Sequence, residues 1–268
     1  MRNRRAGVVG HHVAELVRYR ELVVALVARD VRARYRGSAL GFLWTLLNPL
    51  GLLLVYVLVF GIYLAPHGLP RYAIFALSGL LPWLWISGSL VHGSTSILFS
   101  SAMVKSSAFP PQVLPISIVL QNLVNFLLTS FLLPAACLVL DHPLVPGALL
   151  WFGPIVLATL IETTAAAVLL SVLTVVFRDV QHLTANLLQF LFFLTPITYS
   201  NESVPERFRF LLRANPLASL LRAYQDVLYF GRPPEAGVVA AHFALGLAAW
   251  AVAILVFERY RDDLADLV

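Results

Sequence analysis

ATP chemistry by this chain alone would require a nucleotide-binding loop. A Walker A loop has the pattern Gly-x-x-x-x-Gly-Lys-Ser/Thr, but the only lysine of the chain, Lys105, follows Val104. No His-Glu-x-x-His, Cys-x-x-Cys or EF-hand pattern occurs either. Any P-loop ATP chemistry must therefore come from another subunit.

Three titratable side chains lie inside long apolar stretches, namely Glu162, His92 and His242. Their wide separation in the sequence disfavours an enzyme that needs acids or histidines clustered at one depth. A charged Glu162 at the centre of a membrane helix would cost about 2.5–3.5 kcal/mol. Two interpretations stay open: it faces a cavity or a partner helix, or it is a packing residue that is protonated or hydrogen-bonded to nearby threonines (Thr159, Thr163, Thr164). His92 lies among small residues at 87–96, which favours close helix packing over a ligand role.

The composition indicates which kind of secondary structure holds these residues. Of the 268 residues, 59% are hydrophobic and only 12% are charged, and the mean hydropathy is +0.82. This is about half the charge that a soluble domain usually carries. High hydrophobicity also excludes a disordered chain. One cysteine, Cys137, excludes an intrachain disulfide. The composition predicts an all-α integral membrane protein.

Charged residues divide the chain into uncharged windows, each long enough for one helix of about 20 apolar residues. The runs do not alternate apolar and polar residues as barrel strands would. Six transmembrane helices are predicted, at 40–64, 73–98, 112–140, 146–176, 181–199 and 237–257.

Arginine bias predicts the orientation of these spans. Residues 1–38 carry nine arginines against three acids, and the N-terminal side of the membrane holds 13 basic residues against 6 on the other side. The N-terminus is therefore expected in the cytoplasm. An even number of spans also places the C-terminal tail, 259–268, in the cytoplasm.

Two segments outside the spans are predicted on the cytoplasmic side. Residues 11–36 have valine and leucine at helical spacing, which predicts an amphipathic helix in the membrane interface. It would serve as a basic anchor on anionic lipids, as a partner surface, or as both. The polar loop 99–111 has room for one short helix that ends at Pro110-Pro111. A plain connector is the alternative.

The external segment 200–235 predicts two short amphipathic helices that form a hairpin at the outer interface. Ser203 and Glu206 have capping-box spacing, and Asn215-Pro216 begins the second helix. Arg222 and Asp226 are expected to pair at i,i+4. Gly231 fits the C-terminal cap of the second helix.

Aromatic residues near the predicted membrane edges indicate an interfacial belt, and they are Trp83, Trp85, Tyr63, Tyr72 and Tyr199. Sugars stack on aromatic faces, so an aromatic-lined conduit would suit a glycan. The sequence alone does not say which side the rings face.

Several motifs resemble the membrane subunits of ABC-2-type polysaccharide exporters, the O-antigen and teichoic-acid export permeases. Near the N-terminus they are Arg29-Asp30-Val31-Arg32-x-Arg34-Tyr35, Leu40-Gly41-x-x-Trp44 and Leu47-Asn48-Pro49. Later motifs are Phe192-Phe193-Leu194-Thr195-Pro196-Ile197-x-Tyr199, Asn215-Pro216-Leu217 and Tyr224-x-Asp226-Val227-Leu228. The resemblance runs over most of the chain in the expected order.

This resemblance implies an N-terminal interface helix at 1–38, a transmembrane domain at 39–258 and an extracytoplasmic hairpin before the last span. It implies a homodimer with two separate ATPase subunits, which would bind ATP and Mg while this chain binds no cofactor, metal or nucleic acid. The implied substrate is a lipid-linked polysaccharide, moved across the cytoplasmic (inner) membrane through a channel between the protomers, among membrane lipids.

The resemblance also implies roles for individual residues and no catalytic ones. Residues implied to touch the ATPase are Arg29, Arg32, Arg34, Ser101, Met103, Lys105, Ser106 and Phe109. Channel-lining candidates are Trp44, Tyr56, Tyr63, Trp83, Trp85, Phe193 and Tyr199. The outer gate would contain Phe208, Leu212, Leu221 and Tyr224.

Three alternative functions stay open at this point. An ABC-2 permease for capsular polysaccharide, or for a smaller lipid or drug, would share the same plan. A membrane-embedded glycosyl or lipid transferase would instead act without any ATPase.

Overall fold

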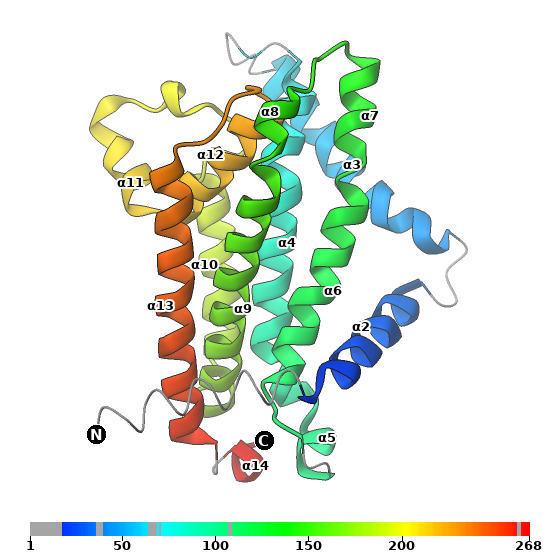
Figure 1. Cartoon of the computed structure of the whole chain (residues 1–268), viewed down its shortest axis with the longest axis vertical. Coiled ribbons are helices and arrows are strands. Elements are labelled where there is room, and N and C mark those ends of the chain that lie inside the picture. The colour runs from blue at the N-terminus through cyan, green and yellow to red at the C-terminus, as the bar shows by residue number, and fades with distance from the viewer. Residues whose placement is uncertain (1–17, 36–39, 64–68, 70, 107–108, 262–263) are drawn as a thin grey trace.

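The computed structural model describes residues 18–35, 40–63, 69, 71–106, 109–261 and 264–268. Within these ranges all regular structure is helical and no strand occurs. The long helices stand side by side as one bundle, and short helices close both ends (Figure 1). The predicted all-helical membrane architecture is confirmed.

Among the residues that the structure describes, five helical stretches are long and apolar enough to cross a membrane. They are α3 (Trp44–Tyr56) with the π-helical turns η2 (Val57–Tyr63), α4 (Tyr72–Phe99), α6 (Val113–Thr129) with α7 (Leu132–Val139), α8 (Pro146–Leu149) with α9 (Phe152–Val176), and α13 (Ala236–Tyr260).

The remaining apolar helix, α10 (Val180–Leu194), is shorter. Its 15 residues extend about 22 Å, less than the roughly 30 Å of a hydrocarbon core. The chain then continues without helix through the buried residues Thr195–Thr198. The count of six spans therefore stays a prediction, although α10 lies where the fifth span is expected.

The centre of the bundle is α4, which packs against α6, α9, α10 and α12. Small residues allow the closest approaches: a Cβ atom at Gly93 would lie 3.0 Å from the Cβ of Ala167 on α9. At Gly246 of α13 it would lie 2.9 Å from Ile161. Close packing through small residues is therefore confirmed for the stretch that contains His92.

The N-terminal helix α2 (Arg20–Tyr35) lies beside the lower half of α6 (Figure 1). Its buried side is formed by Val23 and Leu26, while Arg20 and Glu21 are exposed. Only part of the helix is amphipathic, because Val24 is 66% exposed, and its place in a membrane interface stays a prediction. Residues 11–17 of the predicted helix lie outside the described residues.

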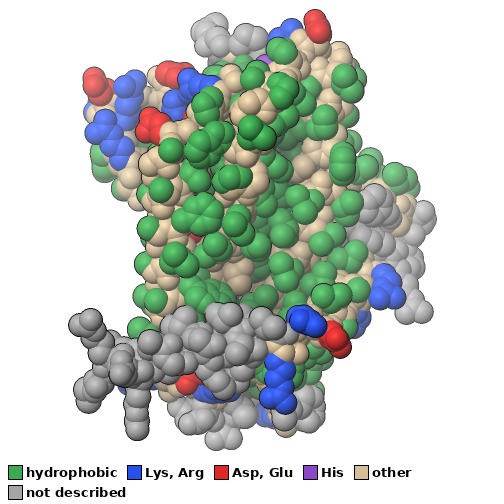
Figure 2. Space-filling view, in the orientation of Figure 1, with side chains coloured by type: hydrophobic (Ala, Val, Ile, Leu, Met, Phe, Trp, Pro, Cys, Tyr) green, Lys and Arg blue, Asp and Glu red, His purple; other side chains and the backbone are tan. Residues whose placement is uncertain are grey.

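Three short elements lie at one end of the bundle: the start of α2, α5 (Ser101–Ser106) and α14 (Leu264–Leu267) (Figure 1). The short helix expected in the loop 99–111 is confirmed by α5. Apolar side chains cover the middle of the visible face, and charged side chains gather toward its two ends (Figure 2).

The segment expected outside the membrane forms η3 (Asn201–Ser203), η4 (Glu206–Phe208), α11 (Arg209–Ala214) and α12 (Pro216–Leu228) at the opposite end of the bundle (Figure 1). Asn215 caps α12 by accepting a hydrogen bond from the Leu217 amide at 3.0 Å. The expected capping box at Ser203 is wrong, because its hydroxyl contacts Ser200 instead. Gly231 follows α12 with φ +62°, the left-handed conformation predicted for it.

Candidate functional site

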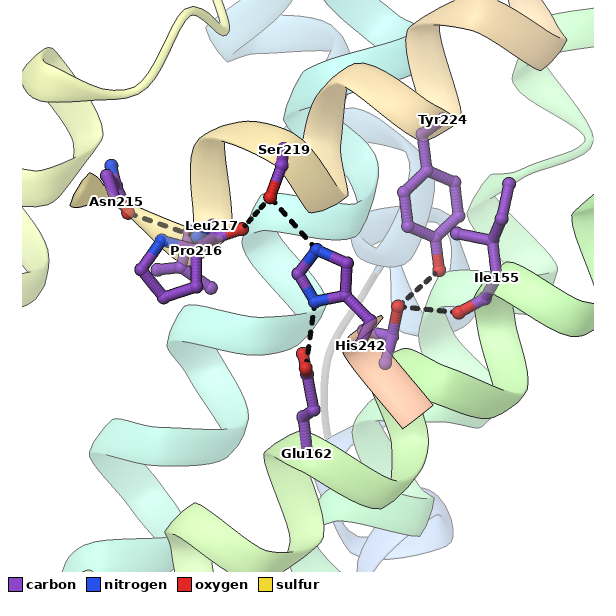
Figure 3. Close-up of polar contacts among 9 residues, drawn as sticks. Ile155, Glu162, Asn215, Pro216, Leu217, Ser219, Tyr224 and His242 are labelled. Atoms are coloured by element: carbon purple, nitrogen blue, oxygen red, sulfur yellow. Dashed lines mark hydrogen bonds and ion pairs between the residues drawn. The ribbon is translucent and has the colours of Figure 1, made fainter. Parts of the chain in front are cut away.

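A buried polar network joins the three helices α9, α12 and α13 (Figure 3). The carboxylate Oε1 of Glu162 on α9 lies 2.8 Å from Nδ1 of His242 on α13. The other ring nitrogen, Nε2, lies 3.0 Å from the Ser219 hydroxyl on α12. The imidazole of His242 is 5% exposed. The network therefore ties α12 to the two long helices α9 and α13.

The hydrogen bonds of this network constrain where its protons lie. The Ser219 hydroxyl donates its single proton to the Pro216 carbonyl at 2.9 Å. Its oxygen then accepts from Nε2–H of His242. The contact at Nδ1 is satisfied by imidazolium beside carboxylate or by neutral imidazole beside a protonated carboxyl group. Both arrangements give the pair zero net charge, which suits an apolar surrounding.

This pairing corrects two sequence expectations. Glu162 and His242, 80 residues apart, are brought together. Two of the three threonines proposed to bond Glu162 have other partners: Thr164 donates to the Leu160 carbonyl, and Thr159 donates to the Ile155 carbonyl and contacts the Tyr224 hydroxyl at 3.0 Å. His92 stays apart on α4, with Nδ1 3.0 Å from the Gly88 carbonyl oxygen. Among the described residues no group of three metal-ligating side chains occurs.

The helix α12 is held by further buried hydrogen bonds to the turn after α10. The Asn215 amide donates to the Thr195 hydroxyl at 2.8 Å, and the Gln225 amide donates to the Pro196 carbonyl at 2.8 Å. Burial raises the pKa of the Tyr224 phenol, so its hydroxyl stays protonated and can donate to Thr159. The motif residues of this region therefore have structural roles in fixing α12.

A cleft of about 600 Å³ lies between α3, α4 and α6. Three aromatic side chains, Trp44, Trp85 and Phe126, contribute to its wall. Asn122 lines this cleft, and its amide nitrogen is buried and has no hydrogen-bond partner among the described residues. Asn122 was not predicted as a site residue, because the spans were defined by charged residues only. An amide inside an uncharged window was the available signal.

The aromatic channel candidates do not share one surface. Trp83 and Trp85 are buried in the middle of α4, so their expected place at the membrane edge is wrong. Trp44, Tyr63 and Phe193 are exposed.

Tyr56 and Tyr199 are both partly buried. The Tyr56 ring of α3 stacks on the Phe192 ring of α10 at 5.7 Å between centroids. The Tyr199 hydroxyl donates to the Phe193 carbonyl at 2.9 Å. The structure therefore brings α3 and α10 together through Tyr56.

The expected pair between Arg222 and Asp226 is wrong. Asp226 binds Arg232 instead, with 2.7 Å between the guanidinium Nη2 and Oδ1. Arg232 lies after the helix end, where the chain turns back at Gly231. Arg222 makes no ion pair with any residue that the structure describes. Its side chain lines a hollow with Arg209 and Arg213.

Comparison with known proteins decides the family. A family model described as ABC-2 type transporter matches residues 21–229. The chain belongs to the ABC-2 type transporter family. Membership was predicted from the motifs and is confirmed.

This ABC-2 chain is similar to three curated proteins over nearly its whole length. It is 37% identical to the O-antigen export system permease protein RfbA of Myxococcus xanthus, covering 96% of this chain and 98% of that protein. It is 26% identical to the RfbA permease of Klebsiella pneumoniae, covering 92% and 95%. It is 26% identical to the polysialic acid transport protein KpsM of Escherichia coli, covering 90% and 93%.

The residues implied to touch an ATPase lie on two elements of the ABC-2 chain. Arg29 and Arg32 are exposed on α2, and Arg29 pairs with Asp30 at 2.8 Å. Met103 on α5 packs against the cluster formed by α2, α6, α9 and α13, while Lys105 is exposed. Ser101 and Ser106 are the first and last residues of α5, and Phe109 follows it. The side chains of Arg34 and Ser106 lie outside the described residues.

The four residues expected to form an outer gate fall into two groups. Phe208 is exposed and Leu212 is partly exposed beside α11, whereas Leu221 and Tyr224 are fully buried on α12. The Tyr224 ring packs edge-on against Phe126 and Phe152. The four residues therefore do not form one cluster in this ABC-2 chain.

Proposed function

We propose that this chain is the membrane subunit of an ATP-driven exporter that moves a lipid-linked polysaccharide across the cytoplasmic membrane. The observation that carries the proposal is 37% identity, over almost the full length of both chains, to an O-antigen export permease. The similarity to a polysialic acid transport protein favours a polysaccharide over a small lipid or drug.

ATP hydrolysis belongs to a separate subunit, because the chain has no Walker A loop. The exposed arginines of α2 and the helix α5 are the proposed contacts with that ATPase. They lie at the same end of the bundle as α14 (Figure 1). The arginine excess of the N-terminal region supports a cytoplasmic position for this end and for both termini.

The exporter is proposed to be a homodimer whose seam includes α3 and α10. Only 6% of the most apolar window of α3 is buried within the protomer. Three amide side chains, Asn48, Asn186 and Gln189, are exposed on these two apolar helices. Exposing amides to lipid is costly, so a partner protomer or a wet conduit is the suitable environment. The Tyr56–Phe192 stack joins the two helices into one surface.

A deletion strain tests the transport proposal. We expect loss of surface glycan together with accumulation of lipid-linked glycan inside the cell, and restoration of both by the intact gene. A Walker A lesion in the partner ATPase should reproduce the deletion. Normal export with that lesion would support a transferase that works alone and would overturn the proposal.

Disulfide cross-linking tests the homodimer. The single native cysteine, Cys137, is buried and can be replaced by serine as background. Leu54→Cys on α3 and Phe190→Cys on α10 should each give cross-linked dimers in membranes. Leu247→Cys on α13, which is exposed to a similar extent, is the matched control. Equal cross-linking of all three positions would overturn the proposed seam.

A further inference from the structure

A cationic hollow of about 260 Å³ lies on the outer hairpin, between η3, α11 and α12. Three arginines from two helices line it, Arg209 and Arg213 from α11 and Arg222 from α12. The remaining lining residues are Asn201, Glu202 and Leu212. With one carboxylate against three guanidinium groups, the lining has a net charge of about +2.

Two of these arginines are not neutralised by any residue that the structure describes. The acid that sequence spacing assigns to Arg222 is occupied by Arg232 at 2.7 Å. Arg213 and Arg222 appear in no ion pair or hydrogen bond with described residues. Arg222 is only partly exposed, so its charge has lost part of its hydration. An anion would supply both the missing charge and the acceptors.

The geometry of the hollow favours a phosphate. Arg209 is oriented by donating its Nε–H to the Val204 carbonyl at 3.2 Å, which leaves the terminal nitrogens of its guanidinium available. Guanidinium groups from two helices that converge on one hollow can each donate two parallel hydrogen bonds to phosphate oxygens. A neutral sugar would leave the net positive charge uncompensated.

Apolar side chains beside the hollow indicate that the phosphate is carried by a lipid. Phe208, Phe210 and Leu211 are all exposed next to the arginines. Charged side chains gather over α11 at the upper left of Figure 2. Large apolar groups beside arginines are typical of a short segment in the membrane interface, with rings toward the acyl chains and guanidinium groups at phosphate depth.

We propose that the hollow formed by Arg209, Arg213 and Arg222 binds the phosphate group of a lipid in the outer leaflet. The assignment to the outer leaflet rests on the proposed function, which puts the hairpin on the outer side of the membrane. A phospholipid headgroup and the phosphate of the lipid carrier of the exported glycan share this chemistry. Binding at this site would hold a lipid phosphate beside the buried helix α12 on the outer side.

Native mass spectrometry of the complex with its ATPase tests the proposal. The probes are phosphatidylglycerol and a polyprenyl phosphate, with diacylglycerol and polyprenol as matched lipids without phosphate. We expect the intact complex to bind the phosphate-bearing lipids, and Arg213→Gln/Arg222→Gln to lose at least about tenfold in affinity. Arg213→Lys/Arg222→Lys should lose less, because it keeps the charge but not the paired donors.

Arg207→Gln is the control variant. Arg207 lies on the same hairpin outside the lining of the hollow, with its guanidinium carbon 4.8 Å from the centroid of the Phe208 ring. This variant should bind within about twofold of the intact complex. Equal losses in Arg207→Gln and the double variant would overturn the proposal, as would equal binding of lipids with and without phosphate. Full competition by inorganic phosphate at matched concentration would overturn the assignment to a lipid.

The relative affinities of the two phosphate-bearing probes identify the source of the phosphate. A preference for polyprenyl phosphate supports the carrier of the exported glycan, and a preference for phosphatidylglycerol supports a membrane lipid. Equal affinity for the two probes supports a site that recognises the phosphate group of either lipid in the outer leaflet. Because binding is measured without transport, failure of the intact complex to bind either phosphate-bearing lipid while it exports glycan normally overturns this inference alone. Retained binding in a chain that exports no glycan overturns the proposed function alone.

Discussion

The helices α3 and α4 have similar apolar composition but opposite surroundings. Their most apolar windows have mean hydropathies of 2.1 and 1.7, yet 6% of the first window and 72% of the second are buried within the protomer. Hydropathy therefore reports that a helix can enter the membrane and not what covers it. The less hydropathic of the two is the centre of the bundle.

Side-chain size and polarity explain this difference better than hydropathy. Buried α4 carries Ser78, Gly79, Ser89, Gly93 and Ser94, which allow neighbouring helices to approach closely. Exposed α3 presents large apolar side chains, including Leu47, Leu50 and Leu54. A small-residue stretch in an apolar window thus indicates contact with protein, and a leucine-rich window indicates lipid or a partner chain.

Truncating a tryptophan on each helix gives the largest expected contrast. Trp85 on α4 is 2% exposed, stacks on Phe126 at 5.0 Å and donates to the Val119 carbonyl. Trp85→Ala should lower the free energy of unfolding by about 3–5 kcal/mol. Trp44→Ala on α3, 52% exposed, should change it by less than about 0.5 kcal/mol. Unfolding titrations in SDS on the purified chain would measure both, and similar losses would contradict the contrast.

Replacing a glycine by a larger residue should also destabilise α4 more than α3, with a smaller difference in the free energy of unfolding. Gly93→Leu places a side chain against Ala167 of α9, so the helices must separate, at a cost of about 1–3 kcal/mol. Gly51→Leu on α3 is the matched control, because nothing lies within 4 Å of its Cβ position. The same titrations apply. A tolerated leucine at Gly93 would mean that α4 and α9 pack less closely than described.

Removing the buried amide of Asn122, beside the cleft between α3, α4 and α6, should raise rather than lower the free energy of unfolding. The Asn122 amide nitrogen has no partner among the described residues, so Asn122→Leu should raise the free energy of unfolding by about 1 kcal/mol. Asn48→Leu on exposed α3 serves as the control and should leave the unfolding of the monomeric chain nearly unchanged. Destabilisation by Asn122→Leu would indicate that an ordered water or a ligand satisfies the amide.

The smallest effect is expected at the contact that ties α3 to α10. Tyr56→Leu removes the ring stack with Phe192 and should cost about 0.5–1 kcal/mol. Tyr56→Phe preserves the stack and is the conservative control. Limited proteolysis of the segment that connects η2 to α4 would report loosening of α3. Equal behaviour of the two variants would show that the stack does not hold α3.

The helical parts of the fold were predictable because membrane insertion depends on local composition. The predicted span 237–257 lies within α13, and the prediction 73–98 differs from α4 by one residue at each end. The caps at Asn215 and Gly231 follow from local backbone chemistry and were also predictable.

The contacts between helices were not predictable in the same way. The bond between Glu162 and His242 depends on which faces of α9 and α13 meet, and no local pattern reports this. Asp226 has two arginines within reach along the chain, and the turn at Gly231 brings Arg232 rather than Arg222 to it. Trp83 and Trp85 resembled an interfacial belt, because periodicity does not reveal how deep a helix lies inside a bundle.

The hydrogen bonds of α12 determine which helix of the hairpin is held firmly by the bundle. Its ties to Thr195, Pro196 and His242 make α12 one rigid body with the end of α10 and with α13. Shifting α12 would break at least these three bonds at about 1 kcal/mol each. The helix α11 packs against α12 and buries no side chain of its own, so the hairpin is anchored to the bundle through α12.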